Sequence, residues 1–166
     1  MNDSSCHTVG STGCNSMNHF ASTAGREREF SEQHNLISTT DTQSRITYAN
    51  EHFCDIAGYH PDELESQYHN VVRHADMPKA AFKDMWDHLK DKKSWMGVVK
   101  NRCKNGDHYW VNAYVTPILD NNGNVFEYQS VRTKPSRADI ERAAGYYQQI
   151  NQGKLPRALR LPTFNI

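Results

Sequence analysis

Three β-prone stretches follow one another in the second half of the chain, and two glycine-containing turns separate them. The stretches run from 95 to 104, from 108 to 118 and from 124 to 133. The turns Lys104–Asp107 and Asp120–Gly123 contain the Asn, Asp and Gly residues that are typical of tight antiparallel connections. This pattern predicts a three-stranded antiparallel meander.

The region before the meander predicts two further strands and two short helices. Residues 34–40 and 45–48 are β-prone and flank a polar turn, which indicates a hairpin. Asn50 is placed to cap a short helix, and Gly58 supplies the left-handed residue that ends it. Pro61 begins a second short helix, because proline is well tolerated at the first helical position.

Helical spacing is clearest between Pro78 and Lys90. Four apolar residues recur there at i, i+3, i+4 and i+7, which predicts an amphipathic helix; they are Phe82, Met85, Trp86 and Leu89. A capping signal at Ser136 predicts a final helix that ends near Gly153, and the charged residues 26–31 predict a short helical lead-in. The fold class is therefore α+β, a five-stranded antiparallel sheet with short helices and one longer helix packed on one face.

The chain is expected to form one domain with tails, because single domains usually contain roughly 100 to 200 residues. Residues 1–25 are rich in Ser, Thr, Asn and Gly and have no structural period, which predicts a disordered tail. The predicted segments are a disordered tail at 1–25, an N-terminal cap at 26–33, the central domain at 34–134, a C-terminal helix at 135–153 and a linker or tail at 154–166.

Charge and composition narrow the function. Lys and Arg together number 19, as do Asp and Glu. The chain therefore has no excess of positive charge to neutralise phosphates, and we do not expect it to bind nucleic acid. No apolar run exceeds three residues, and the first residues lack the features of a secretory signal, so we expect a cytoplasmic chain without a membrane span. No two of the four cysteines have metal-ligand spacing, so we expect reduced thiols and no metal site. The sequence contains no catalytic motif, so we expect no enzymatic activity.

Several stretches of the sequence carry a family resemblance. Ile46-Thr47-Tyr48-Ala49-Asn50-Glu51 and Lys104-Asn105-Gly106, with their neighbours, resemble the hallmark stretches of PAS sensory domains. The blocks 69–86 and 100–111 resemble the FAD-binding PAS domain of bacterial aerotaxis receptors, and the resemblance covers about 36–153. It implies that 34–134 is a PAS sensory domain that binds FAD non-covalently and relays the redox state of the flavin, in response to oxygen, to a chemotaxis signalling output.

The resemblance also implies partners. They are signalling domains of the same receptor, namely a HAMP or kinase-control region, and a homodimer is possible. In a longer receptor, this domain would lie on the cytoplasmic side of the membrane.

Asn101 is the main candidate for a flavin contact. The two-residue period of a strand places Asn101 on the same face as Trp95, toward the core. A buried amide without partners costs about 1 to 3 kcal/mol, so Asn101 needs a hydrogen-bond partner. That partner is either the backbone or, as the resemblance implies, the isoalloxazine ring. Trp95 also belongs to the set of cofactor-binding residues that we predict.

The other candidates come from the long helix and the segment before it. Trp86 is either plain core or, by resemblance, part of the flavin pocket. Arg73, His74 and Asp76 form either a solvated turn or the region that holds the dinucleotide portion of FAD, where a guanidinium suits a pyrophosphate. His69 occupies the position at which light-sensing relatives carry an adduct-forming cysteine, so no adduct is expected, and it is included among the predicted cofactor contacts.

Other readings remain open at this point. The chain could be a cofactor-free PAS interaction module, or a haem-binding gas sensor that uses one of its histidines. Ser130 aligns with a Gln that light-sensing relatives use near the flavin, so a different residue must supply that contact. Trp110, Asn112 and Tyr114 share the outward face of the sheet, where they form either an output surface or the site that the final helix covers.

Overall fold

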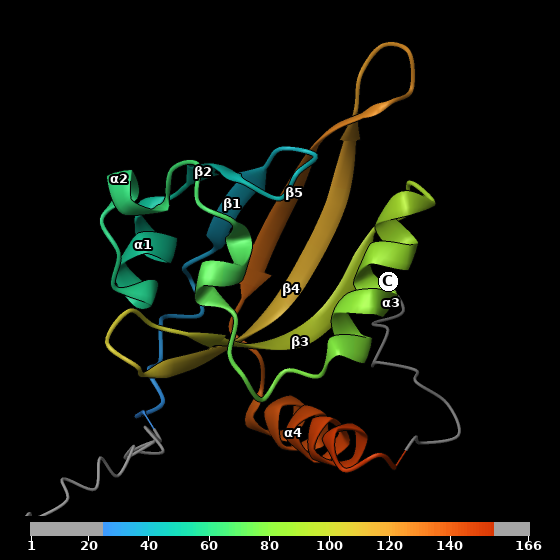
Figure 1. Ribbon diagram of the computed structural model, residues 1–166. Coiled ribbons are helices and arrows are strands. Elements are labelled where there is room, and N and C mark those ends of the chain that lie inside the picture. The colour runs from blue at the N-terminus through green and yellow to red at the C-terminus, as the bar shows by residue number, and fades with distance from the viewer. Residues whose placement is uncertain (1–24, 155–166) are drawn as a thin grey trace, which may run out of the picture.

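A computed structural model describes residues 25–154 and shows one antiparallel sheet with strand order β2-β1-β5-β4-β3 (Figure 1). The predicted hairpin and meander are confirmed. The tails predicted at 1–25 and 154–166 lie almost entirely outside the described residues. In chain order the elements are β1 (Leu36–Thr40), β2 (Ile46–Ala49), α1 (Glu51–Ala57), α2 (Pro61–Leu64), the 3-10 helix η1 (His69–Val72), α3 (Lys79–Lys90), β3 (Trp95–Arg102), β4 (His108–Leu119), β5 (Val125–Thr133) and α4 (Arg137–Asn151).

Asn50 joins α1 to the sheet. Its side-chain oxygen accepts from the backbone N–H of Phe53 at 3.1 Å, which caps the helix, and from that of Ile37 at 2.9 Å. Its amide nitrogen donates to the carbonyl of Asn35 at 2.8 Å. Gly58 ends the helix in the left-handed region with φ 74°, as its position predicts. Both predicted caps of α1 are therefore confirmed.

Replacing Asn50 with alanine should lower the free energy of unfolding by about 2 kcal/mol, because a helix cap and a half-buried N–H both lose their partner. Urea unfolding followed by circular dichroism measures the change. Asn121→Ala in the exposed β4–β5 turn is the matched control and should stay within about 0.5 kcal/mol of the parent. Equal midpoints for Asn50→Ala and the control would contradict this role for Asn50.

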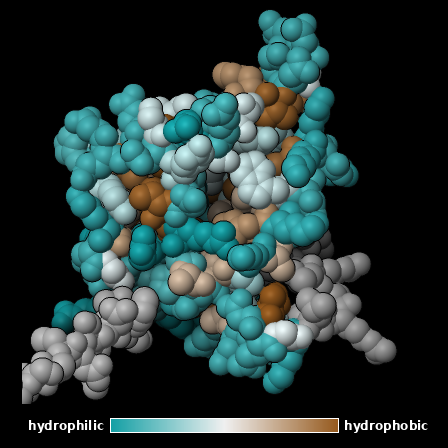
Figure 2. Space-filling view, in the orientation of Figure 1, coloured by the Kyte–Doolittle hydropathy of each residue, from teal (hydrophilic) through white to brown (hydrophobic). Residues whose placement is uncertain are grey.

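The core lies between the inner face of the sheet and the helices α1, α2, η1 and α3. Its fully buried side chains come from strands and helices alike, because alternate positions of each strand point inward. They include Leu36, Phe53, Leu64, Val72, Leu89, Tyr109 and Val111. Hydrophilic residues cover most of the visible surface, and hydrophobic residues show in the recess at its centre (Figure 2).

The helix α4 packs against the opposite face of the sheet, beside β3 (Figure 1). Its buried residues are Ile140, Ala143 and Tyr147, and the hydroxyl of Tyr147 donates to the carbonyl of Val98. Ile140 lines a small cavity together with Trp110, and only 8% of Trp110 is exposed. The final helix thus covers the Trp110 end of the outward face.

The remainder of the predicted output surface is less covered. Tyr114 is 39% exposed, and Asn112 is partly exposed although its side-chain oxygen is buried without a partner among the described residues. The outward face thus divides between the two interpretations: Trp110 is covered, whereas Tyr114 remains exposed.

The predicted helical lead-in at 26–31 is wrong, because this segment is extended and runs alongside β4. Glu27 and His108 form a parallel bridge, and the backbone N–H of Arg28 donates to the carbonyl of His108 at 2.7 Å. The guanidinium of Arg28 donates to the carbonyl of Ile56, and Glu27 forms two hydrogen bonds to Arg137 of α4. These partners lie far away in the sequence, so local charge patterning could not reveal them.

Candidate functional site

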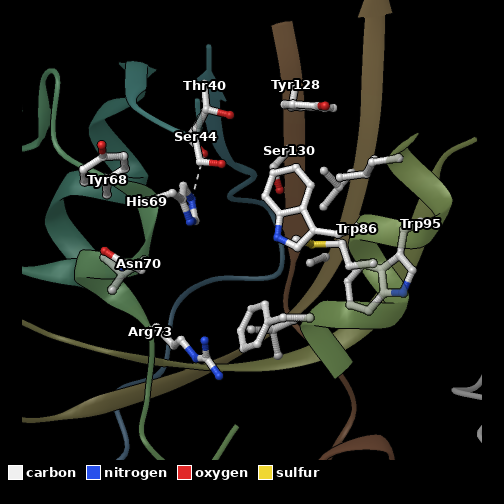
Figure 3. A pocket seen from close by; sticks show the side chains of 18 of the residues that line it. Thr40, Ser44, Tyr68, His69, Asn70, Arg73, Trp86, Trp95, Tyr128 and Ser130 are labelled. Atoms are coloured by element: carbon white, nitrogen blue, oxygen red, sulfur yellow. Dashed lines mark hydrogen bonds between the residues drawn. The ribbon is translucent and has the colours of Figure 1, made fainter. Parts of the chain in front are cut away.

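A cavity of about 380 Å³ lies between the inner face of the sheet, η1 and α3 (Figure 3). This volume falls in the range of small-molecule pockets, roughly 300 to 1,000 Å³. Five of the seven predicted cofactor-binding residues line it, namely His69, Arg73, Trp86, Trp95 and Asn101. None of the described residues that line the pocket is acidic.

Asn101 lies on β3 and lines the pocket, as the two-residue period predicts. Only 4% of it is exposed, and its side-chain nitrogen has no hydrogen-bond partner among the described residues. The hydroxyl of Ser130, on β5, is also buried without a partner and lines the same cavity. Since buried polar groups are normally hydrogen-bonded, the two atoms are available to a polar ligand in this cavity.

Aromatic rings form the wall of the pocket on the side of α3. The indole nitrogen of Trp95 donates to the carboxylate of Asp84 at 2.8 Å, which fixes the ring. A Cβ at Gly97 would lie only 2.4 Å from the ring of Trp95, so glycine at this position allows the ring to lie across the strand. Trp86 meets Tyr128 edge to face, with ring centroids 5.4 Å apart. The wall is therefore held in place before any ligand binds.

Arg132 is a buried cation on the opposite side of the pocket, with 4% of its surface exposed. Its guanidinium donates to the hydroxyl of Ser38 at 3.0 Å and to Nε2 of His69 at 2.7 Å, and it lies 5.1 Å from the ring centroid of Phe53. Burial lowers the pKa of Arg132 to about 10, so the group stays charged at neutral pH. Within residues 25–154, no carboxylate lines the pocket to neutralise this charge, so the lining that the structure describes is electropositive.

The hydrogen bond from Arg132 also determines the protonation state of His69. Arginine can only donate, so Nε2 of His69 must accept and its proton resides on Nδ1. Burial and then the charge of Arg132 lower the pKa of His69 from 6.5 to about 3. His69 is thus a neutral wall residue, and the nitrogen that would coordinate a haem iron is already engaged.

Of the three residues predicted to hold a dinucleotide, only Arg73 lines the pocket. Its guanidinium lies 4.1 Å from the ring centroid of Phe82 and is half-buried. His74 and Asp76 lie outside the pocket lining, where Nδ1 of His74 accepts from the backbone N–H of Asp76 and the carboxylate of Asp76 pairs with Lys100 at 2.7 Å. In this structure, both residues organise the loop that follows Arg73.

The prediction from sequence missed Arg132 and Ser38. The two-residue period of β5 places Arg132 on the inward face with Tyr128 and Ser130, so an inward arginine was a readable signal. Its importance depends on the absence of an acidic partner, and only the three-dimensional arrangement reveals that absence.

Two features are absent from residues 25–154. No helix in this range is long and apolar enough to cross a membrane, and no three His, Cys, Asp or Glu side chains are grouped so that they could hold a metal ion. The thiols of Cys54 and Cys103 are free and buried.

The fold and pocket together define a sensory domain of the PAS type. Residues 46–132, more than half of the chain, match the family model described as the PAS fold, so the chain belongs to the PAS family. It is a PAS domain of the aerotaxis receptor family, since it is 48% identical over 124 residues to the aerotaxis receptor of Escherichia coli (strain K12). That match covers 75% of this chain and 24% of the receptor.

The chain is also similar to a second bacterial protein. The nitrogen fixation regulatory protein of Klebsiella pneumoniae is 31% identical over 96 residues, which cover 58% of this chain and 19% of that protein. The chain spans about a quarter or less of the length of both relatives.

Solved structures share the fold. The dark structure of the blue-light photoreceptor Aureochrome1 LOV has a TM-score of 0.60 and 19% identity, and the match covers 70% of this chain and 86% of that one. A light-oxygen-voltage domain studied with a flavin analogue also has a TM-score of 0.60, with 20% identity over 72% of this chain and 89% of that one. At this level of identity the likeness shows the fold alone.

Proposed function

We propose that this PAS domain binds FAD non-covalently and acts as a redox- and oxygen-responsive sensor. The observation that carries the proposal is that two buried polar groups, Asn101 and Ser130, face one cavity with the charged Arg132 and have no hydrogen-bond partner among residues 25–154. Similarity to an aerotaxis receptor supports a sensory role, and likeness in fold to a domain studied with a flavin analogue is compatible with a flavin ligand.

The residues present fit an isoalloxazine ring and its ribityl chain. The amide of Asn101 can both donate and accept, which suits the alternating polar edge of the ring, while the indoles of Trp86 and Trp95 suit its apolar part. Arg132 would donate to an electron-rich ring atom. Arg73, half-buried in the pocket lining, suits a phosphate oxygen.

A bound flavin would supply reversible oxidation and reduction, and the protein would contribute the polar contacts that distinguish its two states. Reduction adds electron density to the ring, so hydrogen bonds from Asn101 and Arg132 cannot be equally strong in both states. About 59 mV for a one-electron step equals roughly 1.4 kcal/mol, which shifts a conformational equilibrium about tenfold. One altered hydrogen bond is therefore enough to bias a signalling equilibrium, and no catalytic step is proposed.

We propose that the output is a chemotaxis signal. The aerotaxis receptor that this chain resembles is about four times as long as the matched region, which leaves room there for signalling segments. In such a receptor, the domain would act from the cytoplasm on signalling domains of the same molecule. The HAMP or kinase-control region and a homodimer are the partners to test.

The competing reading is a cofactor-free interaction module. The absorption spectrum of the purified protein, followed by release and identification of the chromophore, separates the readings. Flavin bands and released FAD support the proposal. A colourless protein that does not take up added FAD would contradict it, and a Soret band would indicate haem instead.

Asn101→Ala should purify with much less flavin, because about 1 to 3 kcal/mol of hydrogen bonding to a buried amide is lost, which weakens the affinity about 5- to 160-fold. The ratio of flavin to protein absorbance measures the loss, and circular dichroism checks folding. Asn121→Ala, exposed in the distant turn, is the matched control and should retain its flavin. Full retention in folded Asn101→Ala would exclude a pocket role for this amide.

A further inference from the structure

The loop from Arg73 to Met77 begins at a residue of the pocket wall and is attached to the edge of β3. Arg73 lines the pocket and forms an isolated antiparallel backbone bridge with Asn101. Met77 is 3% exposed, and its sulfur accepts from the backbone N–H of Lys100 at 3.3 Å. The loop is therefore attached to β3 at Asn101, which points into the pocket, and at the adjacent residue Lys100.

Asn101 and its neighbour Lys100 point to opposite faces of the strand. The ammonium of Lys100 donates to the carboxylate of Asp76 at 2.7 Å, and the side chain of Lys100 is only 14% exposed. It also lies 5.8 Å from the ring centroid of Trp110 on the outward face. The loop thus contacts both faces of β3, the pocket face through Arg73 and the outer face through Asp76.

The end of α4 reaches the same loop. The side-chain amide of Asn151, the last residue of α4, donates to the carbonyl of Asp76 at 2.8 Å. One turn earlier, the buried hydroxyl of Tyr147 donates to the carbonyl of Val98 on β3. The loop is therefore held between the strand that carries Asn101 and the C-terminal end of the last described helix.

We propose that the Arg73–Met77 loop holds Arg73 in the pocket wall, and that α4 keeps the loop in place through the bond from Asn151 to Asp76. Pocket occupancy and the docking of the end of α4 are then coupled, and the coupling is reciprocal. A ligand that draws in Arg73 stabilises the docked helix, and a pull on the chain beyond Asn151 loosens the pocket. The identity of the ligand rests on the proposed function, whereas the hold of α4 on the loop does not.

The first test uses the protein without flavin. Asn151→Ala removes the bond to the loop, and Gln148→Ala, exposed one turn earlier on the same helix, is the matched control. Hydrogen exchange at the amides of residues 74–77 should become about 2- to 10-fold faster in Asn151→Ala and stay unchanged in the control. Equal exchange in Asn151→Ala and the parent would overturn the proposal.

The second test uses the flavin-loaded protein. Loading should slow exchange in the last turn of α4, and Asn151→Ala should abolish this protection and release FAD about 2- to 10-fold faster. Lys100→Met keeps the apolar stem, removes the ion pair with Asp76 and should act in the same direction. Exchange in α4 that is identical with and without bound flavin would overturn the coupling.

The two proposals can fail separately. If the parent protein binds no flavin but Asn151→Ala still frees the loop, the cofactor assignment fails and the hold of α4 on the loop stands. If flavin binds and exchange in α4 does not change, the cofactor assignment stands and the coupling between the pocket and α4 fails.

Discussion

The free energy of unfolding should fall as the pH drops below 6.5, by up to about 1.4 kcal/mol per pH unit, because of His69. Its pKa is lowered from 6.5 to about 3 in the folded protein, first by burial and then by the charge of Arg132. Between these two values the unfolded chain binds a proton that the folded chain does not, so acid favours unfolding. The stabilising contribution of neutral His69 is complete above pH 6.5 and is lost progressively toward pH 3.

The decisive measurement is the difference in slope between the parent protein and His69→Gln. Glutamine can still accept from Arg132 but does not titrate, so its slope should be shallower between neutrality and about pH 5, where most carboxylates remain ionised. Contributions from the other histidines cancel in this comparison. Urea unfolding at several pH values gives both slopes, and equal slopes would show that His69 titrates normally.

Arg132→Met should weaken flavin binding by about 13- to 160-fold, since a hydrogen bond from a charged donor contributes roughly 1.5 to 3 kcal/mol. The pocket lining contains no acidic residue, so the charge of Arg132 is available to a ligand. Methionine keeps much of the apolar volume of the side chain, which limits the loss of packing against Phe53. Titration of the flavin-free protein with FAD measures the affinity.

Arg102→Met is the matched control, because Arg102 is exposed on the outer side of β3. It removes the same charge from the chain and should leave the affinity within about twofold. Urea unfolding of both variants without flavin separates an effect on binding from an effect on folding. An unchanged affinity in folded Arg132→Met would remove Arg132 from the proposed ligand contacts.

The contrast between Asn101 and Asp76 shows where sequence analysis of the site succeeded and where it did not. Asn101 lies within a strand, and the period of two residues determines its face, so its position in the pocket could be predicted. Asp76 lies in a loop, where no period exists, and the carboxylate pairs with Lys100 on the outer face of β3. Loop side chains are oriented by partners that lie far away in the sequence.

The N-terminal cap illustrates the same limit at the level of backbone structure. Charged residues at 26–31 predicted a helix from local pattern, whereas the segment is extended because it pairs with His108 in β4. Its side chains contact α4 about 110 residues later, as Glu27 does with Arg137. Contacts of this kind can outweigh the weak intrinsic preference of a short polar segment.

The sequence by itself determined the order of strands and helices, the caps at Asn50 and Gly58, and the inward face that carries Asn101. These features depend on turn chemistry and on side-chain periodicity, which act over a few residues. Only the tertiary structure decided that Arg132 is buried without an acidic partner and that Asn151 reaches the loop at Asp76. Burial and pairing depend on which distant segments meet, and no local pattern encodes that.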